Sequence, residues 1–290
     1  MLTANEHYKA VFGRKMYKAS ISFARTCPNR DGTKGTGGCI FCSAGGSGEF
    51  ACGGISGITK QIDDAISQVS KKAGPNAGYI AYFQSFTNTY CSPEELAKAL
   101  DEAAAHPKIG ALSIATRPDC LQENIVDVIA QRASKIPVYV ELGLQTSNDE
   151  TAKLINRCYE TSEYDDAVKR LSVSKVNVIT HVIFGLPGET EEQMLDTVRH
   201  SIFAGTDGIK FTCLYVLKDT VLEKMWKAGE FEVLGQEEYF DIVEKAIRLL
   251  PSDMVVHRLT GDGPKKLLLA PMWTADKRGV INYINRRFAL

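Results

Sequence analysis

The chain has no apolar run long enough to span a bilayer. Its first residues, Met1–His7, lack the basic segment followed by an apolar segment that marks a secretory signal. It also has no internal repeat, low-complexity stretch or obvious linker. These absences predict a cytoplasmic protein with no membrane partner. In that reducing compartment, the eight cysteines are expected to be ligands or buried thiols rather than disulfides.

Net charge is almost absent, at −1, but the charges are unevenly spread. Residues 1–35 carry seven Lys/Arg against two Asp/Glu, residues 256–290 again carry seven against two, and the middle is acidic. Two basic ends that converge would form a patch for a phosphate-rich partner such as a nucleic acid. The alternative is ordinary charge on a solvated surface.

Cysteine is concentrated at one point of the chain. Cys27, Cys39 and Cys42 lie in one glycine-rich loop after the strand-like run 17–23. Three thiolates suit a metal centre that keeps a position open, such as a [4Fe–4S] cluster with one iron free for a small molecule. A four-thiolate zinc site with Cys52 is the alternative. Zinc ribbons normally show two C-x-x-C pairs, and of these four cysteines only Cys39 and Cys42 are spaced in this way.

Strand-like runs alternate with helix-like segments up to about residue 217. The predicted strands are 17–23, 78–84, 111–116, 138–144, 177–185 and 208–216, and the predicted helices lie near 59–73, 94–105, 123–134, 162–174 and 190–204. Apolar strands separated by helices indicate a parallel sheet covered by helices. Six such units are short of the eight in a closed barrel. We therefore predict an α/β fold, a partial (β/α)6 barrel of mostly parallel strands.

The rhythm changes after residue 217. A helix near 236–249, a short strand at 254–259 and a basic helical tail are predicted there. We expect residues 1–217, with the loop 27–42, to form the barrel core. Residues 218–290 are expected to form a helical, basic C-terminal extension that packs on the same domain.

Polar side chains recur at the ends of five successive predicted strands, where parallel α/β folds bind ligands. They are Gln84 and Ser85, Arg117, Glu141 and Gln145, the turn 185–189, and Lys210 with Tyr215. Each alone could be a turn or capping residue, but their recurrence indicates a ligand site. Lys210 lies in an apolar strand and must be paired, because burying a lone ammonium is costly. His181, in mid-strand, is interpreted as a satisfied core histidine.

Together these motifs resemble the radical S-adenosylmethionine (SAM) superfamily. The loop ending in Cys39-Ile40-Phe41-Cys42 resembles its cluster loop, although the usual spacing is C-x3-C-x2-C and eleven residues separate Cys27 from Cys39 here. That wider gap is typical of stand-alone proteins akin to the radical SAM domain of Elongator's catalytic subunit. Segments 82–90, 116–119, 141–145, 183–190 and 258–262 also resemble that group. The chain departs from it at Cys52, and at Asn156-Arg157-Cys158-Tyr159, where the group usually has Asn-Arg-Gly-His.

The resemblance implies the cofactors and their contacts. Cys27, Cys39 and Cys42 would hold a [4Fe–4S] cluster, and the methionine amine and carboxylate of SAM would chelate the fourth iron. An electron from a donor such as flavodoxin or ferredoxin would then cleave SAM to a 5′-deoxyadenosyl radical. The implied SAM contacts are Phe41 and the Gly185–Leu186 backbone at the adenine, Gln84 and Ser85 at the amine, and Glu141, Gln145 and Arg157 at the ribose and carboxylate.

The resemblance and the basic ends both suggest tRNA as substrate, with the hydrogen taken from a wobble-uridine side chain. We expect 290 residues to leave no room for Elongator's acetyl-CoA-binding domain, which favours remodelling of an existing side chain, such as carboxymethylaminomethyl to aminomethyl. Candidate substrate contacts are Arg117, Lys210, Tyr215, Arg258 and Asp262. A small-metabolite or porphyrin-type substrate is one alternative, and a zinc-stabilised binding protein without catalysis is another.

Overall fold

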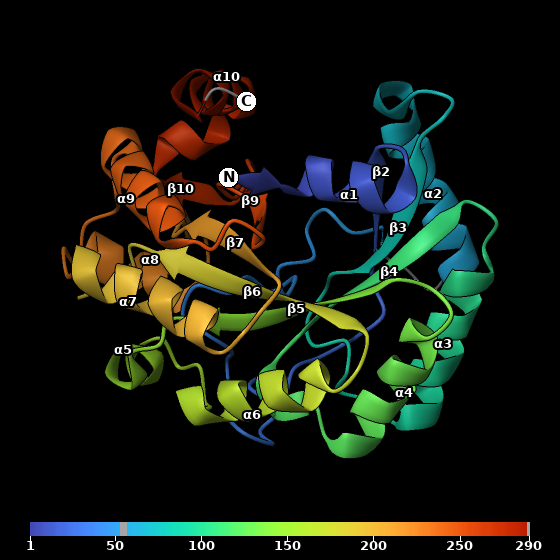
Figure 1. Cartoon of the computed structure of the whole chain (residues 1–290). Coiled ribbons are helices and arrows are strands. Elements are labelled where there is room, and N and C mark those ends of the chain that lie inside the picture. The colour runs from blue at the N-terminus through green and yellow to red at the C-terminus, as the bar shows by residue number, and fades with distance from the viewer. Residues whose placement is uncertain (53–56, 289–290) are drawn as a thin grey trace.

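Eight parallel strands form one open, curved sheet (Figure 1). The structure, a computed structural model, describes residues 1–52 and 57–288. The strand order is β1-β9-β7-β6-β5-β4-β3-β2. The bounds are β1 Leu2–Thr3, β2 Met16–Ile21, β3 Gly78–Phe83, β4 Ile109–Thr116, β5 Val138–Gln145, β6 Val176–Phe184, β7 Gly208–Cys213 and β9 Val255–Arg258. A small antiparallel pair, β8 Val216–Leu217 and β10 Leu268–Ala270, lies outside this sheet.

Helices cover the outer face of the sheet (Figure 1). Their bounds are α1 Ala4–Phe12, α2 Ile58–Ala73, α3 Pro93–Ala105, α4 Glu123–Ala133, α5 Asp149–Leu154, α6 Thr161–Ser172, α7 Glu191–Phe203, α8 Val221–Lys227, α9 Gln236–Leu249 and α10 Lys277–Phe288. Ser92 and Thr190 form the capping boxes that the sequence signals at the starts of α3 and α7. Among the described residues, no helix combines the length and apolarity needed to cross a membrane.

The apolar core is divided by the sheet. One cluster packs β2–β6 against α2, α3, α4 and α6, and a second packs β6, β7 and β9 against α7, α9 and α10. The inner face is polar apart from a small group at one end, where Tyr8 of α1 packs on Ile80, Tyr139 and Ile179. The inner face is therefore the place for a ligand site.

The predicted partial barrel is confirmed, and the sheet is larger than the six predicted strands. β9 pairs in parallel with β7, and β1 pairs with β9. The strand predicted at 254–259 thus belongs to the main sheet, because its buried Val255 and Val256 continue the apolar surface beside Gly208 and Ile209. The barrel stays open between β1 and β2, and α1 crosses this gap, packing on both β9 and β2 (Figure 1).

Candidate functional site

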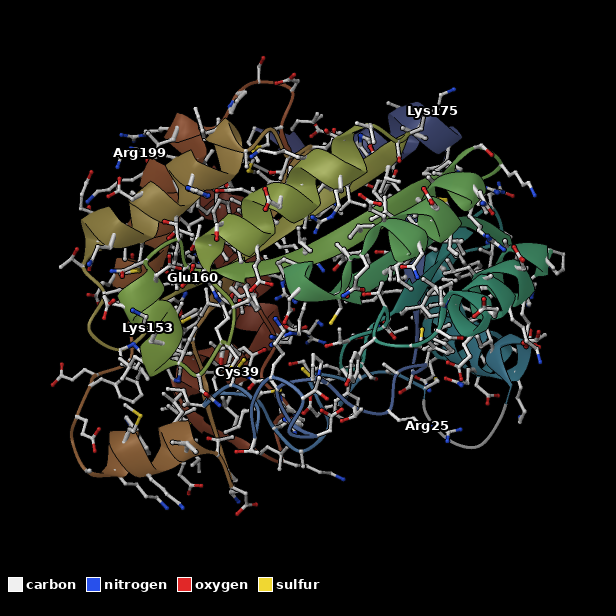
Figure 2. The ribbon with its side chains drawn as sticks, turned by 90° about the horizontal axis from the view of Figure 1, so that it is seen from below. Arg25, Cys39, Lys153, Glu160, Lys175 and Arg199 are labelled. Carbon is white, nitrogen blue, oxygen red and sulfur yellow. The ribbon has the colours of Figure 1, made fainter. Side chains whose placement is uncertain are left out.

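A cavity of about 310 Å³ lies at the C-terminal ends of the strands. Its wall contains Cys27, Cys39 and Cys42 from the loop after β2, together with Gln84 after β3 and Gln145 at the end of β5. Figure 2 shows Cys39 in this loop near α5, which carries Lys153, whereas Lys175, just before β6, lies at the opposite end of the sheet. The cysteines therefore lie at the edge of the sheet that the sequence predicts.

Hydrogen bonds from two side chains fix the cysteine loop. Arg30 Nη2 donates to the carbonyls of Cys42 (3.2 Å) and Ser43 (2.5 Å). Asn156, after α5, donates to the carbonyls of Thr36 (3.3 Å) and Gly38 (2.8 Å). Arg30 thus joins the two ends of the loop, and Asn156 joins the loop to the segment that follows β5.

A close contact at Gly46 holds the far side of the loop. Gly46 has a φ of 59°, and a Cβ built on it would lie 2.2 Å from Cδ1 of Phe86. The Phe86 ring also carries the Arg30 guanidinium at 5.6 Å. Only glycine allows the loop to lie this close to the residues after β3.

The three thiols fit a metal group better than a nucleophilic cysteine. Burial raises the pKa of Cys39 to about 12, helped by the neighbouring Cys42, and burial also raises the pKa of Cys42. Reactive cysteines need the opposite shift, toward the thiolate, and a metal group supplies the missing positive charge.

The position of Cys52 does not suit a four-thiolate zinc site. Its backbone N–H donates to the Ser20 carbonyl (2.9 Å) and its thiol accepts from Gln68 Nε2 of α2 (3.2 Å), and it lies outside the cavity wall. Among the described residues, no group of three or more His, Cys, Asp or Glu side chains is arranged around a single-ion position. A four-iron cluster instead takes each cysteine on a different iron, which three separated thiols in one wall can satisfy.

Glu141 is the electrostatic centre of the inner face. Its carboxylate forms ion pairs with Lys18 of β2 and Lys210 of β7, and it is hydrogen-bonded to His181 Nε2 of β6 (2.9 Å) and Ser113 Oγ of β4 (2.8 Å). The ammonium groups of both lysines also lie over the Tyr82 ring, at 4.1 and 5.1 Å from its centre. Six strands, β2 to β7, thus contribute side chains to one network around Glu141.

Burial opposes the charge on Glu141, and its neighbours outweigh burial. Burial alone would raise the pKa of Glu141, but Lys18, Lys210 and the His181 hydrogen bond hold that pKa well below its ordinary value. Burial, with repulsion from Lys210, lowers the pKa of His181 to about 4, so His181 is neutral at pH 7. Neutral His181 then carries its proton on Nε2, and this N–H donates a hydrogen bond to the Glu141 carboxylate.

Arg157 lines the cavity wall, where a contact with SAM was predicted, but its hydrogen-bond donors are used within the chain. Its side chain is fully buried, and its five N–H groups make five hydrogen bonds, to the carbonyls of Tyr159, Leu144 and Thr146, to Asp149 Oδ1 and to Thr161 Oγ1. A guanidinium has five N–H donors, so none is left for the carboxylate of SAM. Arg157 is a positioning residue that holds the chain after β5.

The other predicted cofactor contacts divide into two groups. Phe41, Gln84, Glu141 and Gln145 lie in the cavity wall. Gln84 Nε2 donates to the Ser47 carbonyl (2.9 Å), and Gln145 Oε1 accepts from the Tyr159 hydroxyl (2.9 Å).

Ser85, Gly185 and Leu186 are not among the wall residues. Ser85 is buried against Gly48, and Leu186 is buried with Ile40 and Leu214 behind the wall. The Gly185 N–H donates to Met194 Sδ (3.1 Å). Strand ends that look equivalent in sequence thus differ in which side chains face the cavity.

All five predicted substrate contacts line the cavity, but their charges differ in availability. Arg117 is neutralised by Asp119 through two hydrogen bonds (2.9 and 2.8 Å), and Asp262 pairs with Lys277. Lys210 pairs with Glu141, as its burial requires. Arg258 donates to Thr212 Oγ1 (2.6 Å), and Tyr215 lies beside it.

Three residues of the site were not predicted as functional. Lys18 is the second cation on Glu141, Arg30 holds the cysteine loop, and Tyr159 orients Gln145. Lys18 could have been predicted in the same way as Lys210, because both are charged residues inside a strand-like run. His181 is hydrogen-bonded, as interpreted from the sequence, but it also faces the cavity.

Known proteins similar to this chain agree with the geometry. The chain matches the Radical SAM superfamily over residues 21–200 and the Radical_SAM C-terminal domain over residues 206–289. It is 39% identical to YtqA of Bacillus subtilis, covering 98% of this chain and 88% of that protein. It is 29% identical to a tRNA uridine(34) acetyltransferase of Methanocaldococcus infernus, over 60% of this chain and 33% of the enzyme.

A solved structure shares the fold. The archaeal Elp3 of Methanocaldococcus infernus superimposes with a TM-score of 0.67 at 20% identity, over 94% of this chain and 63% of that one. Because the superfamily match covers more than half of the chain and YtqA is similar over nearly all of it, family membership does not depend on one motif. Enzymes of this superfamily use a [4Fe–4S] cluster and SAM. This chain belongs to the radical SAM superfamily and is a radical SAM enzyme with an Elongator-like fold.

Proposed function

We propose that Cys27, Cys39 and Cys42 hold a [4Fe–4S] cluster and that the enzyme uses SAM to remodel a wobble-uridine side chain of tRNA, such as carboxymethylaminomethyl to aminomethyl. The observation that carries the proposal is the cavity, which combines the three thiols with polar strand ends in one wall. When bound, the reduced cluster and SAM supply a 5′-deoxyadenosyl radical that can remove hydrogen from an unactivated C–H bond. A flavodoxin or ferredoxin is the proposed electron donor.

The residues of the chain bind and orient these groups. Arg30 and Asn156 hold the loop so that the thiols face the cavity. The Tyr159 hydroxyl lies within hydrogen-bond distance of both the Gly143 carbonyl (2.7 Å) and Gln145 Oε1 (2.9 Å), and so holds the Gln145 side chain at the cavity wall, where it can contact the ribose. Phe41 supplies an apolar surface for the adenine. Glu141, held by two lysines, stays ionised and presents a fixed polar surface below the reacting groups.

The tRNA substrate is supported by sequence similarity. The similarity to a tRNA uridine(34) acetyltransferase covers 179 residues, 60% of this chain. The polar, cation-rich wall of the cavity suits a charged substituent better than a large apolar metabolite.

Two experiments test the proposal. Anaerobic reconstitution should give a brown protein that forms 5′-deoxyadenosine. Cys39→Ala should abolish this product, whereas Cys52→Ala, outside the wall, should retain it. A colourless protein with one zinc per chain after reconstitution would contradict the cluster.

Nucleoside mass spectrometry of tRNA from a strain that lacks the gene tests the substrate. One uridine modification should be replaced by its precursor, and tRNA binding should weaken as salt rises. An unchanged nucleoside profile would exclude tRNA and leave the radical SAM assignment intact.

A further inference from the structure

Arg258 differs from the other arginines of the cavity wall. Arg117 and Arg157 are paired with Asp119 and Asp149, and Arg30 is occupied by loop carbonyls. In the described part of the chain no carboxylate lies within ion-pair distance of Arg258, and its buried Nε has no hydrogen-bond partner. Since buried N–H groups are nearly always paired, Arg258 has a donor that an incoming acceptor would satisfy.

The sheet register builds a corner around this side chain. Parallel pairing of β7 with β9 places Lys210 beside Arg258. At the neighbouring Gly261, a Cβ would lie 3.0 Å from Thr212 Cγ2, 3.1 Å from Tyr215 Cε1 and 3.4 Å from Arg258 Nη2. We call Lys210, Thr212, Tyr215, Arg258 and Gly261 the β7–β9 corner. Thr212 holds the guanidinium in place through its hydroxyl (2.6 Å).

Positive charge exceeds negative charge at this corner. Lys18 and Lys210 share the single carboxylate of Glu141, and Arg258 adds a third cation. Of the other acids of the wall, Asp262 is paired with Lys277, and Glu49 accepts a hydrogen bond from the Ser43 hydroxyl. Burial lowers the pKa of Lys210, and repulsion from Lys18 and Arg258 lowers it further than Glu141 can restore. A bound anion would balance this charge.

We propose that the β7–β9 corner binds a carboxylate group of the substrate, with Arg258 as the residue that determines specificity. The proposal rests on the proposed function, in which the ligand is the carboxylate of a carboxymethylaminomethyl side chain. A guanidinium presents a planar fork that matches a carboxylate. A phosphodiester is a poorer fit, because its two flanking sugars would have to enter the cavity, whereas a flexible uridine substituent can enter alone.

The test compares Arg258 variants in the reconstituted holoenzyme. With tRNA that carries carboxymethylaminomethyluridine, Arg258→Gln should raise KM about ten- to a hundredfold, the usual effect of losing a charge-assisted hydrogen bond. Arg258→Lys should fall between Arg258→Gln and wild type, because an ammonium keeps the charge and loses the fork. Thr212→Val, which removes only the supporting hydroxyl, should raise KM less. Arg199→Gln, an exposed arginine of the outer helix α7, is the charge-matched control and should leave KM unchanged.

Two readouts distinguish a role in substrate binding from a role in cofactor binding. Iron content and 5′-deoxyadenosine formed without tRNA should stay within about twofold of wild type in every variant, since the corner is assigned to substrate and not to SAM. An unchanged KM in Arg258→Gln would overturn the proposal. Loss of substrate-free SAM cleavage would also overturn it, because Arg258 would then hold the carboxylate of SAM.

Small-molecule probes test the β7–β9 corner independently of whether tRNA is the substrate. If the wild type does not turn over the tRNA, the proposed substrate fails, but the corner can still be tested with N-methylglycine, its carboxamide and inorganic phosphate, using ligand-observed NMR on the holoenzyme with SAM. N-methylglycine should bind, its amide should not, and binding should disappear in Arg258→Gln. Binding of phosphate alone, or of none of the three probes, would contradict a carboxylate site.

Discussion

Arg157 uses all of its hydrogen-bond donors inside the chain. Its guanidinium joins three carbonyls, one carboxylate and one hydroxyl between β5 and α6. We expect Arg157→Lys to lower the free energy of unfolding by about 2–4 kcal/mol, because three ammonium donors cannot replace five fixed ones. Denaturant unfolding measures this loss.

The comparison for Arg157 is Arg132→Lys. Arg132 also pairs bidentately, with Asp101, but at the surface, so its replacement should cost less than about 1 kcal/mol. SAM affinity of folded Arg157→Lys should stay within about threefold of wild type. A tenfold weaker affinity without loss of stability would restore the role predicted from sequence.

Two buried histidines should make stability depend on pH. Burial lowers the pKa of His181 to about 4, and burial also lowers the pKa of His257 well below its ordinary value. The unfolded chain therefore binds more protons than the folded chain below about pH 6.5, so stability falls as pH falls. Between pH 7.5 and 5.5 we expect His181 to contribute a loss of about 1 kcal/mol, and His257 a loss of the same sign.

The pH dependence can be assigned by substitution. His181→Gln, which keeps a donor for Glu141, should roughly halve the slope of unfolding free energy against pH. A full slope in His181→Gln would mean that His181 protonates freely in the folded protein.

At the scale of elements, the cysteine loop depends on one close approach. Gly46→Ala would place a methyl group against the Phe86 ring, 2.2 Å from Cδ1, at a φ of 59°. Because the loop must then move away from β3, we expect less than about half of the wild-type iron per chain after reconstitution, and a parallel loss of 5′-deoxyadenosine.

Gly188 supplies a matched control for this substitution. It also has a positive φ, of 81°, but a Cβ there would meet nothing within 4 Å. Gly188→Ala therefore carries the backbone strain without the clash, and its iron content should match wild type. Equal losses in both variants would show that backbone strain alone explains the effect.

Local signals predicted most elements of the core. The six strands β2–β7 and the helices α2, α3, α4, α6 and α7 agree with the sequence because long apolar runs and capping boxes are local features, whereas the short helix α5 was not predicted. The pairing of β1 with β9 was not predictable, since β1 is only Leu2–Thr3 and its partner lies some 250 residues away. Strand pairing between distant segments leaves little trace in either segment.

The site was predictable in part for a similar reason. The cysteines and Gln145 were found from spacing and from strand ends. The role of Lys18 was not predicted, because its contact with Glu141 depends on how β2, β3, β4 and β5 pair in the sheet. Arg157 was assigned from resemblance, and only the structure shows that its donors are already used.

At the scale of the whole molecule, α1 closes the open side of the barrel. Tyr8 is buried against Ile80, Tyr139 and Ile179, and its hydroxyl lies 3.4 Å from His257 Nδ1. Tyr8→Ala should cost roughly 3 kcal/mol of unfolding free energy, as for other large aromatic truncations. Tyr8→Phe keeps the ring and should cost less than about 1 kcal/mol. If denaturant unfolding shows equal losses, the hydroxyl and not the packing is what holds α1.

The chain ends also meet at this scale. β1 pairs with β9, so the two basic ends of the sequence are joined in space. Part of their charge is neutralised, since Arg287 of α10 forms ion pairs with Asp241 and Glu244 of α9. A basic patch for tRNA therefore has fewer free charges than the sequence count suggests.

The sharing of Glu141 by Lys18 and Lys210 has a consequence for inheritance. The three residues come from β2, β5 and β7, far apart in the chain, yet the charge of each is tolerated only because of the others. A lineage that lost the carboxylate would leave the ammonium groups of half-buried Lys18 and buried Lys210 opposed, so we expect substitutions at these positions to be acquired together. Among related sequences, we expect Lys18, Glu141 and Lys210 to be kept together or replaced together, even where the residues around them differ.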